Sequence, residues 1–400
     1  MDLQSHYPYW LMKNGMVHVY PSLQTSMDTD VAIIGAGISG ALAAYYLYRD
    51  DMKVTVLDRR HAGMGSTAAS TALLQYELDV PLHTLAERIG KRNAVHAYKY
   101  CRKAIYDLQQ VCKKLGTDVG FELRPSLQYA SEIKHQHALY REYGFRLKSG
   151  FRVNWLDSPE IEQLFGFKAP GAILSEDAAV VDSYLLTHAL LQYVQQKQYG
   201  VYDNTTVTGI QHEDNRVILH TDTGHRVRAK KLVIACGYET QQYLPKQVAE
   251  LYSTYALVSE PMEQETFWYQ NSLIWETAMP YLYFRTTPDQ RLLIGGKDDP
   301  FTNAGIRDAR LKSKTTKLMQ AFRQKFPELP VRPDFAWAGT FATTPDGLPY
   351  IGTVPELPNT FFSLGYGGNG IIFSAVAGQI IRDMIKGRTS PDYEIFSFNR

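Results

Sequence analysis

The chain has 400 residues, which is enough for two domains with a full core. Its 42 basic and 41 acidic residues almost cancel, and the formal charge of +1 gives no electrostatic reason to expect nucleic acid as a partner. No run reaches about 18 apolar residues, so we expect no transmembrane segment. Residues 1–27 lack the continuous apolar region of a signal peptide, and they are expected to form an arm on the surface.

The cysteine pattern points to a reduced protein. Cys101 and Cys112 fall on one predicted helix, where they would lie roughly 16 Å apart, too far for a disulfide. Cys236 falls in a predicted buried strand. We therefore expect a cytoplasmic protein, and no spacing of histidine, cysteine or acidic residues resembles a metal site.

A glycine-rich turn follows the first apolar run. Residues 31–34 have no polar break, which is typical of a strand buried on both faces. Gly35, Gly37 and Gly40 then follow in the spacing G-x-G-x-x-G, and residues 41–48 are rich in helix formers. In such a turn the first glycine makes the bend, the second lets a pyrophosphate approach the backbone, and the third lets the helix pack closely.

The segment Val54-Thr-Val-Leu57 is predicted to be the neighbouring parallel strand. It ends at Asp58, 23 residues after Gly35, where a carboxylate can accept hydrogen bonds from both hydroxyls of an adenosine ribose. The free N–H groups at the helix start would favour a phosphate. The combination predicts a dinucleotide site, with a tight turn and no ligand as the alternative. This stretch alone leaves open whether the ligand is FAD or a nicotinamide.

The middle of the chain alternates predicted helices and strands. Residues 59–72 are rich in small and hydroxyl residues, which let a backbone press against a ligand, although a plain loop is the alternative. Residues 73–78 are expected to lead into helical material. Further helices are predicted at 81–90, 91–116, 135–148, 183–198 and 305–326, and strands within 121–130, 207–211, 217–221, 231–237, 251–260, 281–286 and 291–295.

The C-terminal part repeats the arrangement of strand, glycine turn and helix. Residues 360–364 read as a strand, residues 365–370 contain four glycines, and residues 371–386 read as a helix. A nicotinamide fold has no need of a second such turn more than 300 residues after the first. A flavin site does need a second turn, because the isoalloxazine ring must be held far from the adenosine end. The second turn therefore favours FAD.

Five motifs together resemble those of the D-amino-acid oxidase-like family of FAD-dependent oxidoreductases, which includes sarcosine, glycine and gamma-glutamylputrescine oxidases. The resemblance runs from about residue 28 to residue 387. It comprises the glycine fingerprint with Asp58, Gly65-Ser-Thr, Leu232-Val-Ile-Ala-Cys-Gly237, Thr344-Pro-Asp-Gly-Leu-Pro-Tyr-Ile-Gly352 and Gly365-Tyr-Gly-Gly-Asn-Gly-Ile371.

The resemblance implies an α/β fold, α+β overall. A Rossmann-like FAD-binding domain would comprise residues 1–80, 170–245 and 335–400. It would be interleaved with an antiparallel-sheet substrate domain of residues 81–169 and 246–334. The implied cofactor-binding residues are Gly35, Gly37, Ile38, Ser39, Gly40, Asp58, Arg59, Gly65, Ser66, Thr67, Thr71, Ala72, Val207, Cys236, Gly237, Gly339, Gly367, Gly368, Asn369, Gly370 and Ile371.

Two places depart from the sarcosine oxidase pattern. Those enzymes tether FAD to a cysteine a few residues before the Thr-Pro-Asp motif, and here that place is near Gly339 without a cysteine in reach. Non-covalent FAD is therefore expected. The lysine that those enzymes carry after the second glycine cluster is replaced by Ile372.

The resemblance implies oxidation of a C–N bond in an amine or amino acid, with oxygen or an electron carrier as the final acceptor. The alternatives are a flavin dehydrogenase of 2-hydroxy acids and a non-catalytic flavoprotein. Alternation in the predicted strand 281–286 puts Tyr283 and Arg285 on one face. If that face looks onto the flavin, Tyr283 forms an aromatic wall and Arg285 binds a substrate carboxylate with two parallel hydrogen bonds. The alternative is that the face points to solvent or that Arg285 pairs with an acidic residue elsewhere. Across the cavity we expect Trp337, Tyr366 and Asn369.

Overall fold

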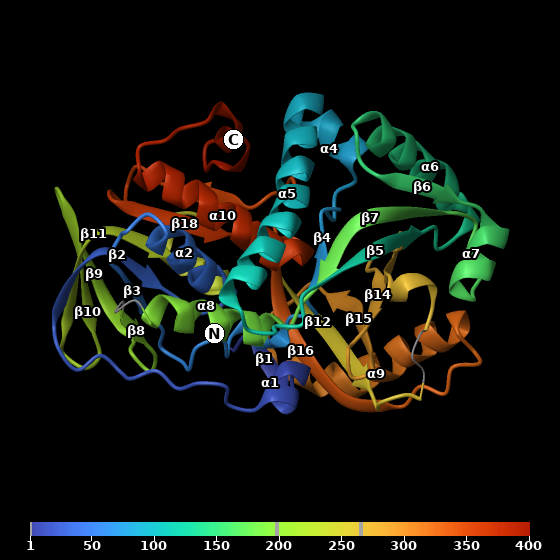
Figure 1. Ribbon diagram of the computed structural model, residues 1–400, viewed down its shortest axis with the longest axis horizontal. Coiled ribbons are helices and arrows are strands. Elements are labelled where there is room, and N and C mark those ends of the chain that lie inside the picture. Colours follow the sequence, from blue (N-terminus) through green and yellow to red (C-terminus); the bar gives the residue numbers. More distant parts are fainter. Residues whose placement is uncertain (1, 197–199, 264–266) are drawn as a thin grey trace.

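The computed structural model describes residues 2–196, 200–263 and 267–400, which form an eight-stranded and a ten-stranded sheet lying side by side (Figure 1). The helices α2 (Ile38–Tyr48), α8 (Ser183–Gln195) and α10 (Gly370–Ile385) belong to the first sheet. The long helix α5 (Lys91–Leu115) stands between the two halves, and α9 (Ala304–Lys325) packs on the second sheet.

The eight-stranded sheet has a parallel centre of buried apolar strands. Every residue of the strand at Val54–Leu57 is buried, including the polar Thr55. The strand order is β17 (Tyr350–Gly352), β18 (Thr360–Leu364), β11 (Arg226–Ile234), β2 (Met27–Ile34), β3 (Val54–Leu57) and β8 (Gly200–Tyr202), with β10 (Arg216–Thr221) and β9 (Val207–Glu213) added as a hairpin on β11. The neighbours from β18 to β8 run parallel, as in a Rossmann-like sheet.

The ten-stranded sheet is antiparallel except where β13 meets β5. Its order is β1 (Gln4–His6), β16 (Pro333–Thr343), β12 (Glu250–Ser259), β15 (Leu292–Asp299), β14 (Leu282–Thr286), β13 (Leu273–Glu276), β5 (Glu122–Tyr129), β7 (Ala172–Val180) and β4 (Leu73–Gln75), with β6 (Val153–Leu156) beside β7. The remaining helical segments are α1 (Tyr9–Asn14), α3 (Ser66–Ala69), α4 (Leu82–Ile89), α6 (Ile133–Lys148), α7 (Ser158–Phe165), η1 (Gly237–Tyr243), η2 (Tyr269–Asn271), η3 (Gly367–Asn369) and η4 (Pro391–Phe396).

The two sheets share the chain in an interleaved way. Four strands from segments assigned to the predicted FAD-binding domain, namely β1, β4, β7 and β16, pair in the ten-stranded sheet. The expected boundaries near residues 80, 170 and 335 therefore do not coincide with a change of sheet. The mixed α/β fold class is confirmed, whereas the division into domains stays a prediction.

The N-terminal segment differs from the expected surface arm. Residues 4–6 add the edge strand β1 to β16, while Tyr9 and Trp10 are only 2% and 1% exposed. The Trp10 indole N–H also donates to the Ser70 carbonyl oxygen at 2.6 Å. Burying two large rings is worth several kcal/mol, which favours a packed segment over a solvated arm.

Residues 73–75 form the strand β4, and the helix that follows begins at Leu82, one residue after the expected start. The helix α8 begins at Ser183, as expected, and is capped by Asp182, whose carboxylate accepts from the N–H groups of Tyr184 and Leu185. The predicted end of that helix at residues 197–198 lies outside the described residues. Within the described ranges, no helix combines the length and apolar character needed to cross a bilayer.

Candidate active site

A cavity of about 410 Å³ lies where the two sheets meet, in the size range of small-molecule sites. Every predicted cofactor-binding residue except Gly40 lines it, as do Tyr283, Trp337, Tyr366 and Asn369. We call the part around Gly35, Gly37, Asp58 and Val207 the fingerprint end. The part lined by Thr254, Trp275, Tyr281, Tyr283 and Asp298 of the ten-stranded sheet, together with Glu77 and Asp79, is the roof end.

The glycine fingerprint shapes the fingerprint end through close packing. Gly35 has a φ of +111°, and a Cβ there would lie 2.5 Å from the Ala235 carbonyl oxygen. Both the backbone conformation and the lack of space therefore exclude a side chain. Gly40 does not line the cavity, because it faces the strand-to-helix turn and a Cβ would overlap the Gly35 carbonyl oxygen. Its function is therefore to let α2 lie against β2. No side chain caps the start of α2, where Gly37 is the N-cap.

Asp58 is held rigidly at the end of β3. Its Oδ2 accepts from the Ala36 N–H at 2.7 Å and its Oδ1 from the Arg60 N–H at 2.9 Å. Burial raises the pKa of Asp58, while these two N–H groups act in the opposite direction. Each carboxylate oxygen has a further lone pair, which can accept from a ribose hydroxyl.

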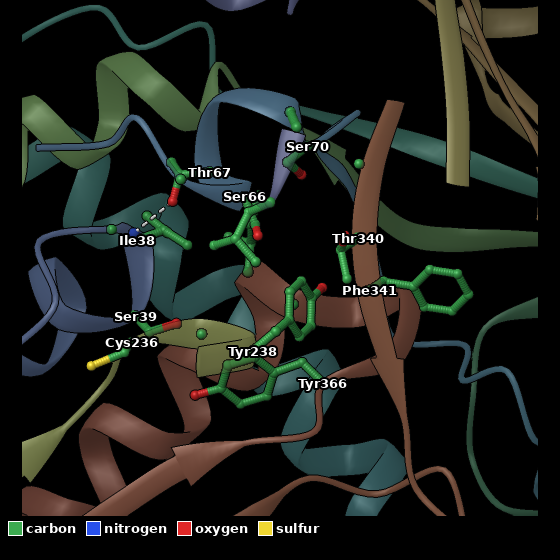
Figure 2. Close-up of a pocket in the computed structure, with 18 of the residues that line it drawn as sticks. Ile38, Ser39, Ser66, Thr67, Ser70, Cys236, Tyr238, Thr340, Phe341 and Tyr366 are labelled. Atoms are coloured by element: carbon green, nitrogen blue, oxygen red, sulfur yellow. Dashed lines mark hydrogen bonds between the residues drawn. The ribbon is translucent and has the colours of Figure 1, made fainter. Parts of the chain in front are cut away.

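The hydroxyl-rich segment after β3 faces the same cavity. Thr67 Oγ1 accepts from the Ile38 N–H at 3.0 Å, which ties this segment to the start of α2 (Figure 2). Ser66 Oγ is buried and has no hydrogen-bond partner among the described residues, although it lines the cavity. Figure 2 shows Ser66, Thr67 and Ser70 across the opening from Tyr238 and Tyr366. An orphaned hydroxyl beside a glycine turn fits a phosphate or a ribityl chain.

The second glycine turn brings another helix start to the cavity. No side chain caps the start of α10, because the Asn369 side chain instead donates to the carbonyl oxygens of Gln75 and Glu77, at 2.9 Å each. Ser374 of α10 and Ser39 of α2 are hydrogen-bonded at 2.7 Å, so the two helices meet near their first turns. Two positive helix ends therefore open onto one cavity, which suits a ligand with a phosphate and a second electron-rich group.

The other predicted aromatic residues have structural bonds as well as places in the wall. The Trp337 indole N–H donates to the Ala69 carbonyl oxygen at 2.9 Å, and the Tyr366 hydroxyl is hydrogen-bonded to Ser363. The ring of Tyr366 stacks on Phe373 of α10. These bonds fix the ring positions.

Arg285 does not reach the cavity, contrary to the prediction that it binds a substrate carboxylate. It is 1% exposed, and its guanidinium donates to the carbonyl oxygens of Ala72 at 2.6 Å and Thr71 at 3.3 Å. The guanidinium carbon also lies 5.5 Å from the centre of the Trp10 ring. Alternation does place Arg285 on the face of Tyr283, but the backbone of residues 71–72 and helix α1 cover that part of the face. Burial and the neighbouring Arg124 lower the pKa of Arg285 to about 9, so it remains charged at neutral pH.

The prediction missed three polar residues on the segment formed by β4 and the residues directly after it. Gln75, Glu77 and Asp79 line the cavity, whereas Leu74, Tyr76 and Leu78 between them belong to the core. The signal was present in the sequence, because residues 74–79 alternate strictly between apolar and polar, the period of a half-buried strand. Asp298, Trp275 and Tyr281 come from three separate strand regions, and nothing local in the sequence marks them as neighbours.

Fold and cavity together define a dinucleotide-binding flavoprotein. The sequence profile of the FAD dependent oxidoreductase family matches residues 30–384, and the chain belongs to that family. The predicted family, enzyme class and FAD cofactor are confirmed.

The chain is similar to several characterised proteins. It is 26% identical to a glycine oxidase of Geobacillus kaustophilus over 93% of this chain and 97% of the relative. The crystal structure of a glycine oxidase from Geobacillus kaustophilus has a TM-score of 0.78, with 21% identity, over 94% of this chain and 99% of that chain. Identity is 21% to a gamma-glutamylputrescine oxidoreductase of Escherichia coli, covering 92% and 86% of the two chains. An L-amino acid deaminase from Proteus myxofaciens, 15% identical, has a TM-score of 0.78 and covers 96% of each chain.

Proposed function

We propose that this enzyme oxidises a C–N bond of an amine or amino acid. The observation that carries the proposal is the cavity itself, in which the uncapped start of α10 lies directly beside the aromatic wall of the roof end. That arrangement lets one small molecule lie between the wall and a flavin ring. The similarity to proteins named for glycine, gamma-glutamylputrescine and L-amino acids supports a substrate with nitrogen.

The cofactor residues take their roles from the geometry described above. Gly35, Gly37 and the start of α2 would hold the pyrophosphate, Asp58 the ribose, and Val207 the adenine. Ser66 and Thr67 would contact the phosphates and ribityl chain, and residues 367–371 the ring. The N–H groups at the start of α10 would stabilise negative charge there. The Cys236 thiol donates to the Ile34 carbonyl oxygen at 3.2 Å, and we expect FAD to be bound without a covalent tether.

The chemistry needs few groups from the protein. FAD, when bound, would supply the acceptor for the hydride of the C–H bond next to nitrogen, and oxygen or an electron carrier would take up the two electrons. The neutral amine releases one N–H proton to solvent, so that a C=N bond forms, and water can then convert the imine to a carbonyl compound. The task of Tyr283, Trp337 and Tyr366 is to orient the amine and exclude water.

The three described cysteines are unpaired, which supports a cytoplasmic location.

An anaerobic panel of amines, amino acids and 2-hydroxy acids tests the proposal. Loss of the oxidised flavin absorbance with a nitrogen compound, together with one equivalent of carbonyl product per flavin, is the expected result. Reduction by 2-hydroxy acids alone would overturn the proposal in favour of C–OH chemistry. A flavin that no member reduces, in protein that dithionite does reduce, would point to a non-catalytic flavoprotein.

A further inference from the structure

The roof end is lined by carboxylates and aromatic rings. Asp79 accepts from the Tyr281 hydroxyl and from the Gly368 N–H, at 3.1 Å each, so it lies at the second glycine turn. Asp298 lines the same end, and the charges of Asp79 and Asp298 influence each other. Within the described part of the chain, neither carboxylate has a basic group within 4.0 Å.

Two carboxylate oxygens at this end have no hydrogen-bond partner. Asp298 Oδ1 is inaccessible to solvent and unpaired in the described structure. The same holds for Oε2 of Glu77, a residue that is 4% exposed and whose other oxygen lies 3.8 Å from Arg146 Nη1. Buried acceptors without a partner are costly, and a ligand that donates hydrogen bonds would satisfy them.

No basic side chain among the described residues lines the roof end. Among the described residues that line the cavity, the basic ones are Arg59 and Arg60, and both belong to the fingerprint end beside Asp58. Arg285, the expected partner of a substrate carboxylate, is bonded to main-chain oxygens elsewhere. A ligand carboxylate would therefore meet Asp79 and Asp298 with no basic side chain in the described cavity wall beside it, which is unfavourable. Lys314, which lowers the pKa of Asp298, lies outside that wall and is paired with Asp299 at 2.7 Å.

Three aromatic rings complete the wall. Tyr281 lies between Trp275 and Tyr283, with ring centres separated by 6.3 Å and 5.8 Å. Tyr283 fits here because its partner across the strand pair is Gly295, where any Cβ would overlap the Tyr283 ring. Aromatic faces beside carboxylates are the usual environment for an organic cation. No three metal-ligating side chains gather among the described residues, so an alkylammonium fits better than a metal ion.

We propose that the substrate is an amine carrying a second, positively charged group and no carboxylate, with the second group held by Asp79, Asp298 and the ring of Tyr281. This inference rests on the proposed C–N oxidation. The reacting nitrogen must be neutral to release a hydride from its neighbouring carbon, whereas the distal ammonium keeps its charge. The retained charge is what the acidic roof end recognises, so diamines and related cationic amines are preferred to α-amino acids.

A charge series on one carbon chain tests this preference. The compounds are 1,4-diaminobutane, 1-aminobutane and 4-aminobutanoate, whose far ends are positive, neutral and negative. We expect kcat/KM for anaerobic flavin reduction to be at least about tenfold higher for the diamine than for the monoamine, and lowest for the amino acid. Three- and five-carbon counterparts are measured alongside, so that chain length does not decide the comparison.

The Asp298→Asn variant assigns the preference to the roof end. It should bring the ratio of diamine to monoamine to within about threefold of unity, with the FAD content retained. Glu162→Gln is the matched control, because Glu162 is an exposed carboxylate on α7, paired with Lys168, and does not line the cavity. Should Asp298→Asn not fold, the wild-type series still decides.

The outcomes separate this inference from the proposed function. Equal rates for diamine and monoamine, or faster reduction by 4-aminobutanoate or glycine, would overturn the cationic preference while leaving C–N oxidation in place. An unchanged ratio in Asp298→Asn would remove that carboxylate from recognition and overturn the assignment. Reduction by 2-hydroxy acids alone would overturn both.

Discussion

The two ends of the cavity are built in different ways. The fingerprint end comes largely from one continuous stretch, in which β2, the glycine turn, α2 and β3 follow one another, and Asp58 is fixed by two backbone N–H groups. The roof end is assembled from residues more than 200 positions apart, such as Asp79 and Tyr281, which share a hydrogen bond at 3.1 Å. The first end has polar groups suited to a phosphate and a ribose, and the second has two carboxylates, Asp79 and Asp298, with no salt bridge to a described residue. Under the proposals above, local sequence defines how the cofactor binds, and tertiary packing defines what the enzyme selects.

The largest expected effect comes from the fingerprint end. Gly40→Val should abolish FAD binding, because the side chain would overlap the Gly35 carbonyl oxygen and push α2 off the turn. Flavin content per protein, read from absorbance, measures the result. Gly144→Ala on α6 is the control, because a Cβ there meets no atom within 4 Å and FAD content should not change. Full flavin content in Gly40→Val would contradict this account of the turn.

A variant of Arg285 tests whether this residue stabilises the fold or binds the substrate. Arg285→Ala removes the donor to the Thr71 and Ala72 carbonyl oxygens, and leaving such groups unpaired costs about 1–3 kcal/mol each. We expect the free energy of unfolding to fall by about 3 kcal/mol, measured by denaturant titration, with little change in the KM of the retained activity. A large rise in KM, with the free energy of unfolding unchanged, would show that Arg285 binds the substrate after all.

Asp58 tests the ribose contact. Asp58→Ala should weaken FAD binding by about 1.5–3 kcal/mol, the scale of hydrogen bonds to a charged group. Titration of the apoprotein with FAD, followed by flavin fluorescence, gives the dissociation constant. Since Asp58 also accepts from the Ala36 and Arg60 N–H groups, the thermal stability of the apoprotein has to be measured beside it. An unchanged dissociation constant would mean that Asp58 does not contact the ribose and only ends the strand β3.

The smallest effect is a pH dependence of the charge preference. Burial, with Asp79 and Asp299 nearby, raises the pKa of Asp298 to about 6, while Thr254 and Lys314 act in the opposite direction. The carboxylate is charged above this pH and neutral below it. The ratio of kcat/KM for diamine to monoamine should therefore be full at neutral pH and fall as the pH drops through about 6.

The Asp298→Asn variant separates Asp298 from the other titrations. Protonation of the reacting amine affects both substrates alike, whereas Asp79, whose pKa burial also raises, lowers the ratio on acidification in the same direction as Asp298. Asp298→Asn should therefore weaken the dependence, and Asp79 accounts for the part that remains. A ratio of kcat/KM for diamine to monoamine that rises on acidification would contradict the role given to the charged Asp298 carboxylate.

The fingerprint end was predictable because each of its features is local. The apolar run, the glycine spacing and the acid after the second strand all fall within residues 31–58, and the structure places them as expected apart from the position of Gly40 behind the wall. The same holds for the second glycine turn and α10, where a strand, a glycine cluster and a helix succeed one another.

The roof end was predicted only in part. Alternation correctly put Tyr283 in the wall, yet it could not reveal that residues 71–72 and Trp10 cover the face at Arg285. The N-terminal segment was expected on the surface, so its part in this cover was missed. The alternation of residues 74–79 was overlooked because helical sequence follows closely, and with it Asp79 was lost.

The most direct measurement is the anaerobic rate of flavin reduction by the best amine, compared with the same amine deuterated at the carbon next to nitrogen. The account predicts that the flavin is reduced and that deuterium slows the reduction several-fold, because the C–H bond is broken in the cavity as the hydride leaves. Failure of every amine and amino acid to reduce the flavin, while a 2-hydroxy acid does so, would contradict it.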